Sequence, residues 1–261
     1  MIVRLFTSAA LAALVVCGAG GAHAQDAQQF TPKQVEAIEK IVQDYLLTHP
    51  EIIPQAISAL QEKERMAQET EAQRYLNDKG GEIFKDPAAP VLGNPDGDVN
   101  VVEFVDYNCG YCKAVHAAVK DAVKADGKVR LIYKELPILG ETSVVAARAA
   151  LAANMQKKYA EFQEALIKNR GPLSEDAIMK IAEQTGLDME KLKADMASPD
   201  VEAALQKNQI QARNLAIRGT PSFIVGSRVI YGAVDKGTLK QLIDQSRTPM
   251  ERERALMREK N

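Results

Sequence analysis

Two cysteines separated by two residues are the most reactive feature of the sequence. In FVDYNCGYCK, residues 104–113, Cys109 and Cys112 directly follow a run of strand-forming residues. Such pairs serve as metal ligands, structural disulfides or redox dithiols. A structural zinc site normally needs four ligands, usually two spaced pairs, and this chain has one such pair. A disulfide across so short a loop restricts the unfolded chain little. The spacing therefore favours thiol–disulfide exchange.

A redox role gives the two cysteines different tasks. A helix is expected to begin at Gly110, and its unpaired N–H groups favour a thiolate at Cys109. We expect Cys109, with an exposed sulfur, to be the nucleophile, and Cys112, one turn later, to be the resolving thiol. Gly110 leaves the approach to Cys109 open, and neither it nor Tyr111 adds a charge. The pair is therefore predicted to suit disulfide shuffling better than one-way oxidation.

Soft-metal binding is the rival interpretation of the same pair. Two thiolates suit Cu(I), so a copper site made by Cys109 and Cys112 stays open, and no other cofactor is required. His116 shares a helix face with Cys112 and could assist a metal, although a packing role is the favoured interpretation. Glu103 lies on the strand before the pair, where a carboxylate needs a partner or a proton unless it sits at an exposed margin.

The elements around the pair predict a βαβ unit. Residues 99–107 are apolar nearly throughout, as in a buried strand, and the following helix should stop at Gly127. A second strand over 128–136 would then pair in parallel through a right-handed crossover. Residues 141–216 are expected to form helices, followed by a hairpin over 221–234 and a closing helix. The expected helices span 142 onward, 156–168, 174–185, 188–196, 199–216 and 235–246.

The N-terminal part contains a targeting pattern and a helical segment. Residues 1–24 combine a basic start, an apolar run and Ala22-His23-Ala24, which predicts a cleavable signal peptide. Residues 31–79 are predicted to be helical, interrupted at Pro50, with an apolar stripe that we expect to self-associate. The charged stretch after the stripe is polar nearly all round, so it should stand away from the main domain. Gly80-Gly81 should end the segment.

Composition limits the class of partner. The 261 residues carry a net charge of −2, which gives no reason to expect nucleic acid as a partner. The charged tail, residues 247–261, is expected to fray.

Residues 86–246 resemble DsbA-like thiol:disulfide interchange proteins. The resemblance rests on PVLGNPDGDVNVVEFVDYNCGYCK and RGTPSFIVG, and on the order of the elements. It implies an α/β class: a thioredoxin fold with a helical insertion, preceded by an α-helical N-terminal oligomerisation segment. It also implies a cis peptide bond at Thr220-Pro221, with Thr220 offering backbone groups to substrate. Glu103 would lie beneath the disulfide and relay protons.

The N-terminal stretch YLLTHPEIIPQAI resembles the suppressor-of-copper-sensitivity protein C (ScsC) branch of that family. This resemblance implies a periplasmic oligomer, commonly a trimer, with residues 25–81 as oligomerisation segment and linker and 82–246 as the catalytic domain. Its expected activity is disulfide isomerisation or reduction of misoxidised exported proteins, with a membrane thiol reductant as partner. A Cu(I)-binding protein of copper tolerance and a dithiol oxidase are the alternatives.

Overall fold

A computed structural model describes residues 30–248. The predicted signal peptide and all but the first two residues of the charged tail lie outside this range. The chain divides into two compact units, Met1–Ala59 and Leu60–Asn261, so the division falls earlier than the expected boundary at residue 81. Between residues 30 and 248, no helix has the length and apolar character needed to cross a membrane.

The first unit contains helix α1 (Pro32–Thr48) and the start of α2 (Ile52–Phe84). A capping box starts α1: the backbone N–H of Thr31 donates to Gln34 Oε1 at 2.9 Å. The helix ends at His49, immediately before Pro50. No residue of α1 is buried within the chain. The predicted helical segment and its interruption are therefore confirmed.

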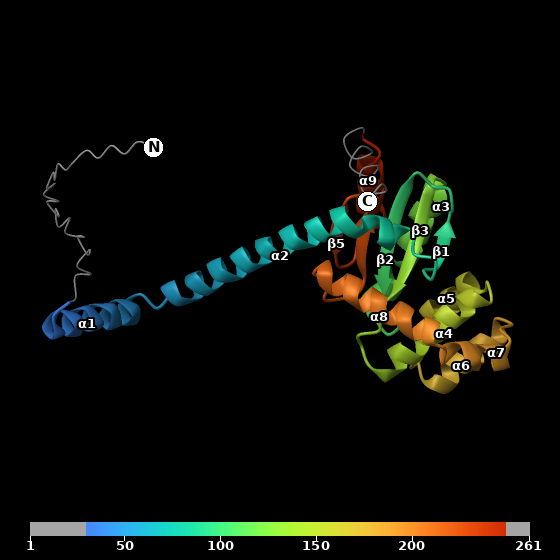
Figure 1. Cartoon of the computed structure of the whole chain (residues 1–261), viewed down its shortest axis with the longest axis horizontal. Coiled ribbons are helices and arrows are strands. Elements are labelled where there is room, and N and C mark those ends of the chain that lie inside the picture. The colour runs from blue at the N-terminus through green and yellow to red at the C-terminus, as the bar shows by residue number, and fades with distance from the viewer. Residues whose placement is uncertain (1–29, 249–261) are drawn as a thin grey trace, which may run out of the picture. The chain divides into compact units, whose positions relative to one another are not determined.

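The second unit is built on a five-stranded sheet with the order β1-β3-β2-β4-β5 (Figure 1). Strands β2 and β3 are parallel, as the βαβ pattern predicts, and the other pairs are antiparallel. The short strand β1 was not predicted, because its three residues lie in a loop rich in proline and glycine. The strands are β1 (Val91–Gly93), β2 (Val99–Val105), β3 (Val129–Glu135), β4 (Ser222–Val225) and β5 (Arg228–Tyr231).

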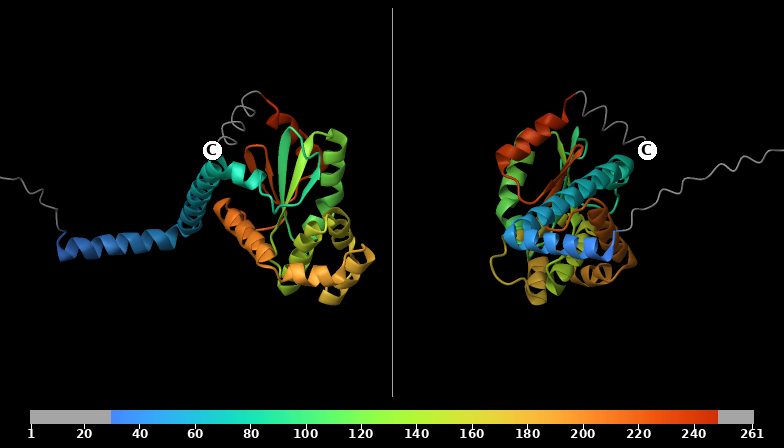
Figure 2. Two further views of the ribbon diagram at one scale, coloured as in Figure 1. Left: turned by 45° about the vertical axis from the view of Figure 1, so that its right-hand side comes forward. Right: turned by 90° about the vertical axis from the view of Figure 1, so that its left-hand side faces the viewer.

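Helices cover both faces of the sheet (Figure 2). The closing helix α9 (Lys236–Ser246) packs against α3 (Gly110–Asp126), which ends at Gly127 in the left-handed conformation, as expected. The end of α2 and the segment that follows the last insert helix pack on the opposite face. The expected helical insert is present as α4 (Glu141–Met155), α5 (Tyr159–Lys168), α6 (Glu175–Gln184), α7 (Met189–Met196) and α8 (Pro199–Asn214).

Helix α2 corrects two expectations. It runs through Gly80-Gly81 to Phe84, so the glycine pair does not end it. Its charged part also does not stand away from the domain, because Leu76 and Ile83 are fully buried against the sheet. Gly80 is buried between them. A few small or apolar residues on one face were enough to dock the charged C-terminal part of this helix.

The beginning of the C-terminal tail is also anchored rather than frayed. Arg247 Nη2 lies 2.8 Å from Asp98 Oδ1 and 2.6 Å from Asp126 Oδ1. These two carboxylates flank β2 and end α3, so Arg247 fastens the end of α9 to the βαβ unit. A charge run in the sequence does not reveal such partners, because they lie more than 120 residues away.

Candidate active site

Asp106 organises the turn between β2 and α3. Its carbonyl oxygen accepts a hydrogen bond from the backbone N–H of Cys109 at 3.0 Å. Its buried carboxylate accepts from Ser143 Oγ at 2.8 Å and from the backbone N–H groups of Ile138 and Leu139 at 2.8 and 3.0 Å. Sequence reasoning missed this residue, although Asp after a strand is a common turn former. The turn is thereby tied to the start of the helical insert.

Cys109 is the N-cap of α3 and has an extended backbone. Its Sγ lies 3.0 Å from the carbonyl oxygen of Thr220, to which the thiol donates. The residue is only 6% exposed, so the expectation of an open sulfur at the sheet edge is wrong. The loop that precedes β4 covers it. A side-chain carbon at Gly110 would meet nothing within 4 Å, and Tyr111 is 72% exposed, so the surface beside the thiol is open.

The loop before β4 contains the second expected site element. The peptide bond between Thr220 and Pro221 is cis, as the resemblance implies. Ser222 Oγ donates to the carbonyl oxygen of Gly219 at 2.8 Å and closes the loop from below. Thr220 Oγ1 is buried and has no hydrogen-bond partner within residues 30–248. Thr220 and Cys109 are 111 positions apart in the sequence and adjacent in space.

Cys112 is fully buried, one turn into α3. Burial raises the pKa of its thiol, because the thiolate would lose its solvation. Both cysteines are free thiols in the structure. Cys112 therefore needs a proton acceptor nearby before it can act as a nucleophile.

Glu103 supplies a buried carboxyl group close to Cys112. It lies in the middle of β2, is 1% exposed, and interacts electrostatically with the Cys112 thiol. Burial raises the pKa of Glu103 to about 8, and a hydrogen bond from Tyr133 partly opposes this shift. Its Oε2 atom has no partner among the described residues. The structure thus places Glu103 in the core, and the alternative of an exposed margin is wrong.

A second buried carboxyl group lies on the same face of the sheet. Glu135 Oε1 accepts hydrogen bonds from Tyr107 at 2.8 Å and Tyr159 at 2.7 Å. Burial raises the pKa of Glu135 to about 8, although both tyrosines oppose the shift. The rings of Tyr133 and Tyr159 are in contact, with centroids 5.6 Å apart. Tyr133 also interacts with Glu103, so it lies between the two buried carboxyl groups. The sequence offered one signal for Glu135, a carboxylate at the end of an apolar strand.

His116 is a buried packing residue, as the favoured interpretation held. Its Nε2 lies 3.1 Å from Glu164 Oε2. Within residues 30–248, no group of three or more His, Cys, Asp or Glu side chains is arranged to hold a metal ion. A Cu(I) ion held by Cys109 and Cys112 would therefore have two protein ligands from this part of the chain.

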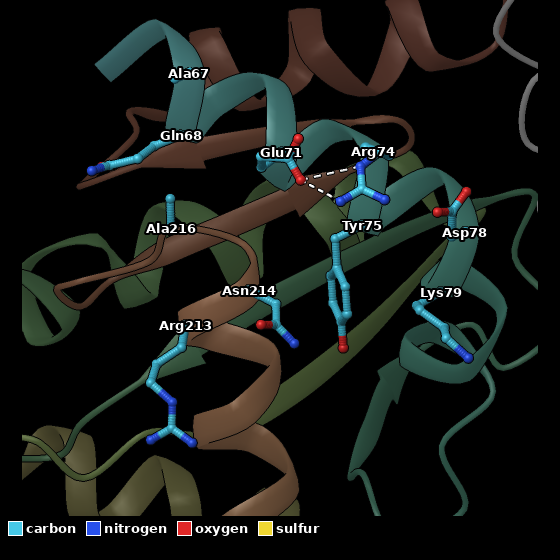
Figure 3. Close-up of a pocket in the computed structure, with 10 residues that line it drawn as sticks. All are labelled: Ala67, Gln68, Glu71, Arg74, Tyr75, Asp78, Lys79, Arg213, Asn214 and Ala216. Atoms are coloured by element: carbon cyan, nitrogen blue, oxygen red, sulfur yellow. Dashed lines mark hydrogen bonds and ion pairs between the residues drawn. The ribbon is translucent and has the colours of Figure 1, made fainter. Parts of the chain in front are cut away.

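A separate pocket of about 530 Å³ lies between α2 and the end of α8 (Figure 3). Charged and polar side chains line it together with Ala67, Tyr75 and Ala216, and Glu71 is paired with Arg74 from its own helix. Tyr75 points from α2 toward Asn214 across the hollow. Neither cysteine and no unpartnered buried group lines this pocket, so the chemistry belongs to the Cys109 site.

Comparison with known proteins gives a consistent result. A family model described as thioredoxin matches residues 85–245, and one described as copper resistance protein ScsC N-terminal domain matches residues 34–67. A thioredoxin-like oxidoreductase from Silicibacter pomeroyi DSS-3 is 48% identical in sequence, with a TM-score of 0.63 over 64% of this chain and 96% of that one.

Two further relatives extend the match. Proteus mirabilis ScsC in a transitional conformation is 29% identical, with a TM-score of 0.62 over 83% of this chain and 98% of that one. A probable disulfide bond formation protein D from Bacillus cereus is 29% identical over an alignment of 181 positions, which covers 64% of this chain and 83% of the relative.

Proposed function

This chain belongs to the thioredoxin family and is a thiol–disulfide oxidoreductase of the DsbA and ScsC type, and we propose that it acts mainly as a disulfide isomerase or reductase. The observation that carries the proposal is the combination of the Cys109–Cys112 dithiol with an uncovered apolar face on α1. The substrates would be exported proteins with wrongly paired disulfides, and the protein would act in the periplasm after loss of residues 1–24.

The dithiol chemistry follows from the site. The Cys109 thiolate attacks a substrate disulfide, forms a mixed disulfide and releases one substrate thiolate. In isomerisation, that thiolate attacks a second substrate disulfide, and a later substrate thiolate displaces Cys109. In reduction, the ionised fraction of Glu103 takes the Cys112 proton, and Cys112 attacks the Cys109 sulfur. This step releases the second substrate thiolate and leaves a Cys109–Cys112 disulfide and a reduced substrate. A membrane thiol reductant would then supply two electrons and two protons to regenerate the dithiol.

The loop beside Cys109 can hold an extended substrate. The Thr220 carbonyl oxygen accepts a hydrogen bond from the Cys109 thiol. It would lose this hydrogen bond, and become available to a substrate, when the sulfur forms a mixed disulfide. We propose that backbone groups of Thr220 and Pro221 then bind the substrate chain. The open surface beside Gly110 and the exposed ring of Tyr111 give the substrate access.

The N-terminal helix supports self-association. Val35, Ile38, Val42 and Tyr45 recur at alternating spacings of three and four, the spacing of a coiled-coil seam, and each is more than 40% exposed. An apolar helical face of this kind normally marks an interaction site. We propose a homotrimer formed through residues 31–79, which would present several dithiols to one substrate and raise their effective concentration.

The test measures association and isomerisation together. Val42→Lys places a charge in the proposed seam, and Gln43→Lys makes the same charge change at the neighbouring polar position. We expect light scattering to give monomers for Val42→Lys and oligomers for the wild type and Gln43→Lys. Val42→Lys should still reduce insulin but should recover scrambled ribonuclease poorly. A monomeric wild type, or full ribonuclease recovery by monomeric Val42→Lys, would contradict the isomerase proposal.

Cu(I) binding by the same dithiol is the second candidate, favoured by the match of residues 34–67 to a copper resistance family. Cys109 and Cys112 would both lose their protons to hold the ion, which would block disulfide exchange while it is bound. Competition with a coloured Cu(I) chelator should show one ion bound per reduced chain and none per oxidised chain. A chelator that removes all copper from the reduced protein would eliminate this candidate.

A further inference from the structure

A pocket of about 470 Å³ lies on the far side of the active-site helix, between α3, α5 and the β1–β3 edge of the sheet. Its apolar walls include Leu92, Val123 and Leu131. Its polar wall comes from α3 and α5 and includes Lys120 and Gln163. The size and the mixture of a largely apolar lining with a few polar groups are typical of small-molecule sites.

Gln163 is the strongest sign that the pocket is built for a ligand. The residue is 1% exposed, and its Nε2 atom has no hydrogen-bond partner within residues 30–248. A buried amide donor without a partner costs free energy, so its retention needs a reason. A ligand that presents an acceptor oxygen to Gln163 would supply the missing hydrogen bond.

The charges around the pocket favour an anionic acceptor. Lys120 and Lys124 line the pocket together with one carboxylate, Glu164. Glu164 is already paired with Lys120 at 2.5 Å and, outside the pocket lining, with Lys168 at 2.6 Å. His116 Nε2 lies 3.1 Å from the same carboxylate, which accepts its hydrogen bond. Lys124 forms no ion pair in the described part of the chain, which leaves positive charge for a ligand.

We propose that this pocket binds a small carboxylic acid with an apolar body. The carboxylate accepts a hydrogen bond from Gln163 Nε2 and is attracted by the lysines of the rim. The apolar body lies against Leu92, Val123 and Leu131. Neither a cation nor an uncharged hydrocarbon would satisfy both the unpartnered donor and the positive rim.

The pocket is connected to the redox centre by a short path. Tyr133 lines the pocket and also hydrogen-bonds Glu103, the carboxyl group beside Cys112. His116, also in the lining, lies one turn after Cys112 on α3. A carboxylate bound in this pocket therefore places a negative charge near Tyr133 and Glu103, the groups proposed to take part in transfer of the Cys112 proton. Its affinity should differ between the dithiol and disulfide forms.

The test uses the full chain and octanoate as the probe, with octan-1-ol as the uncharged comparator. Calorimetry should show saturable octanoate binding and at least roughly tenfold weaker binding of octan-1-ol. Gln163→Leu should weaken octanoate binding roughly tenfold or more. Ala160→Trp, an exposed change at the pocket lining, should block it. In glutathione buffers, saturating octanoate should change the ratio of reduced to oxidised protein.

The control variant is Gln211→Leu. Gln211 is also a buried amide with an unpartnered atom, but it lies on α8, away from this pocket. Its replacement should leave octanoate affinity unchanged and shows what loss of a buried amide does by itself. Equal affinities for octanoate and octan-1-ol, equal effects of Gln163→Leu and Gln211→Leu, or no saturation would overturn the proposal. An unchanged redox ratio would overturn the coupling to Cys112.

Discussion

Ionisable side chains are buried on both faces of the sheet, without a charged partner on one face and with one on the other. On the face covered by α3, Glu103 and Glu135 are buried without any cation, and burial raises the pKa of each to about 8. On the opposite face, Lys134 is equally buried but lies 2.5 Å from Asp86 Oδ2, and Lys207 lies 3.1 Å from Asp86 Oδ1. The face covered by α3 contains carboxyl groups that are protonated at neutral pH, and the opposite face contains an ion-paired cluster.

The difference separates a chemical role from a structural one. Lys134 and Glu135 are neighbours in β3, so alternation of side chains alone sends them to opposite faces. A paired buried charge is fixed in its ionised state, because losing either partner is costly. An unpaired carboxyl group with a pKa near neutrality can gain or lose a proton during a reaction. Only the face with the unpaired acids also carries Cys109 and Cys112.

Breaking the ionic cluster should have the largest effect. Lys134→Met leaves Asp86 buried with Lys207 as its only remaining cationic partner, so we expect a loss of about 3 kcal/mol in the free energy of unfolding. Urea titration followed by circular dichroism measures it. The double variant with Asp86→Asn should recover much of the loss, since it removes the stranded charge. A loss as large in the double variant as in Lys134→Met would show that packing, and not pairing, explains the effect.

Removing the unpaired acid should affect chemistry before stability. Glu103→Gln keeps the shape but cannot take the Cys112 proton, so the mixed disulfide should resolve more slowly, on the order of a hundredfold. Acid-quenched mass spectrometry of a single turnover follows this intermediate. Glu135→Gln is the matched variant on the same face, and its effect should be smaller because Glu135 is held by two tyrosines. An unchanged lifetime in Glu103→Gln would remove the proton-transfer role.

The same acid predicts a pH dependence of stability. The pKa of Glu103 is about 8 in the folded protein, against an ordinary value of 4.5, so the folded state holds this proton over a range in which the unfolded chain has lost it. Its contribution is therefore full below about 4.5 and declines as pH rises toward about 8, by up to about 1.4 kcal/mol per pH unit. Above that pH no further loss follows.

Urea titrations of the reduced protein between these limits provide the measurement. In Glu103→Gln, the fall of the unfolding free energy with pH should become shallower by the slope that one titrating proton contributes. The exposed variant Glu161→Gln should show the same fall as the wild type. A decline of equal slope in Glu103→Gln and the wild type would mean that the carboxyl group ionises freely in the folded state, and would remove the contrast between the two faces.

The sequence predicted the elements well and the contacts between them poorly. The βαβ unit, the insert helices and the hairpin all follow from local periodicity and from Gly127, which stops α3. The resemblance supplied the cis bond at Thr220-Pro221. The docking of α2 was missed because Leu76 and Ile83 follow a long charged stretch, and only a partner surface shows that they share a buried face.

The candidate site was predicted at its centre and missed at its support. Cys109 and Cys112 are visible as a local motif, whereas Asp106 acts by accepting hydrogen bonds from residues near position 140. Likewise, the environment of Glu135 depends on hydrogen bonds from Tyr107 and Tyr159, which lie on different segments of the chain. The burial of Cys109 under Thr220 also depends on a contact across 111 residues. No sequence window contains these partners.

The ion pairs of Arg247 are partly exposed, unlike the buried acids and the buried ionic cluster. Their removal should have the smallest effect on stability. The Arg247 side chain is 20% exposed, and its partners Asp126 and Asp98 are 15% and 42% exposed, so water screens part of the attraction. Its hydrogen bonds lower the pKa of Asp126. We expect Arg247→Ala to cost about 1 kcal/mol of unfolding free energy in low salt, and less in high salt.

Urea titration in low and high salt distinguishes this ion pair from the buried cluster. The loss in Arg247→Ala should shrink as salt rises, whereas the loss in Lys134→Met should hardly change, because that charge is out of contact with solvent. Lys240→Ala removes the exposed pair with Asp244 and should have almost no effect at either salt concentration. If Arg247→Ala is as neutral as Lys240→Ala, the Arg247 ion pairs contribute nothing to the stability of the domain, and the contrast would rest on the buried cluster around Asp86 alone.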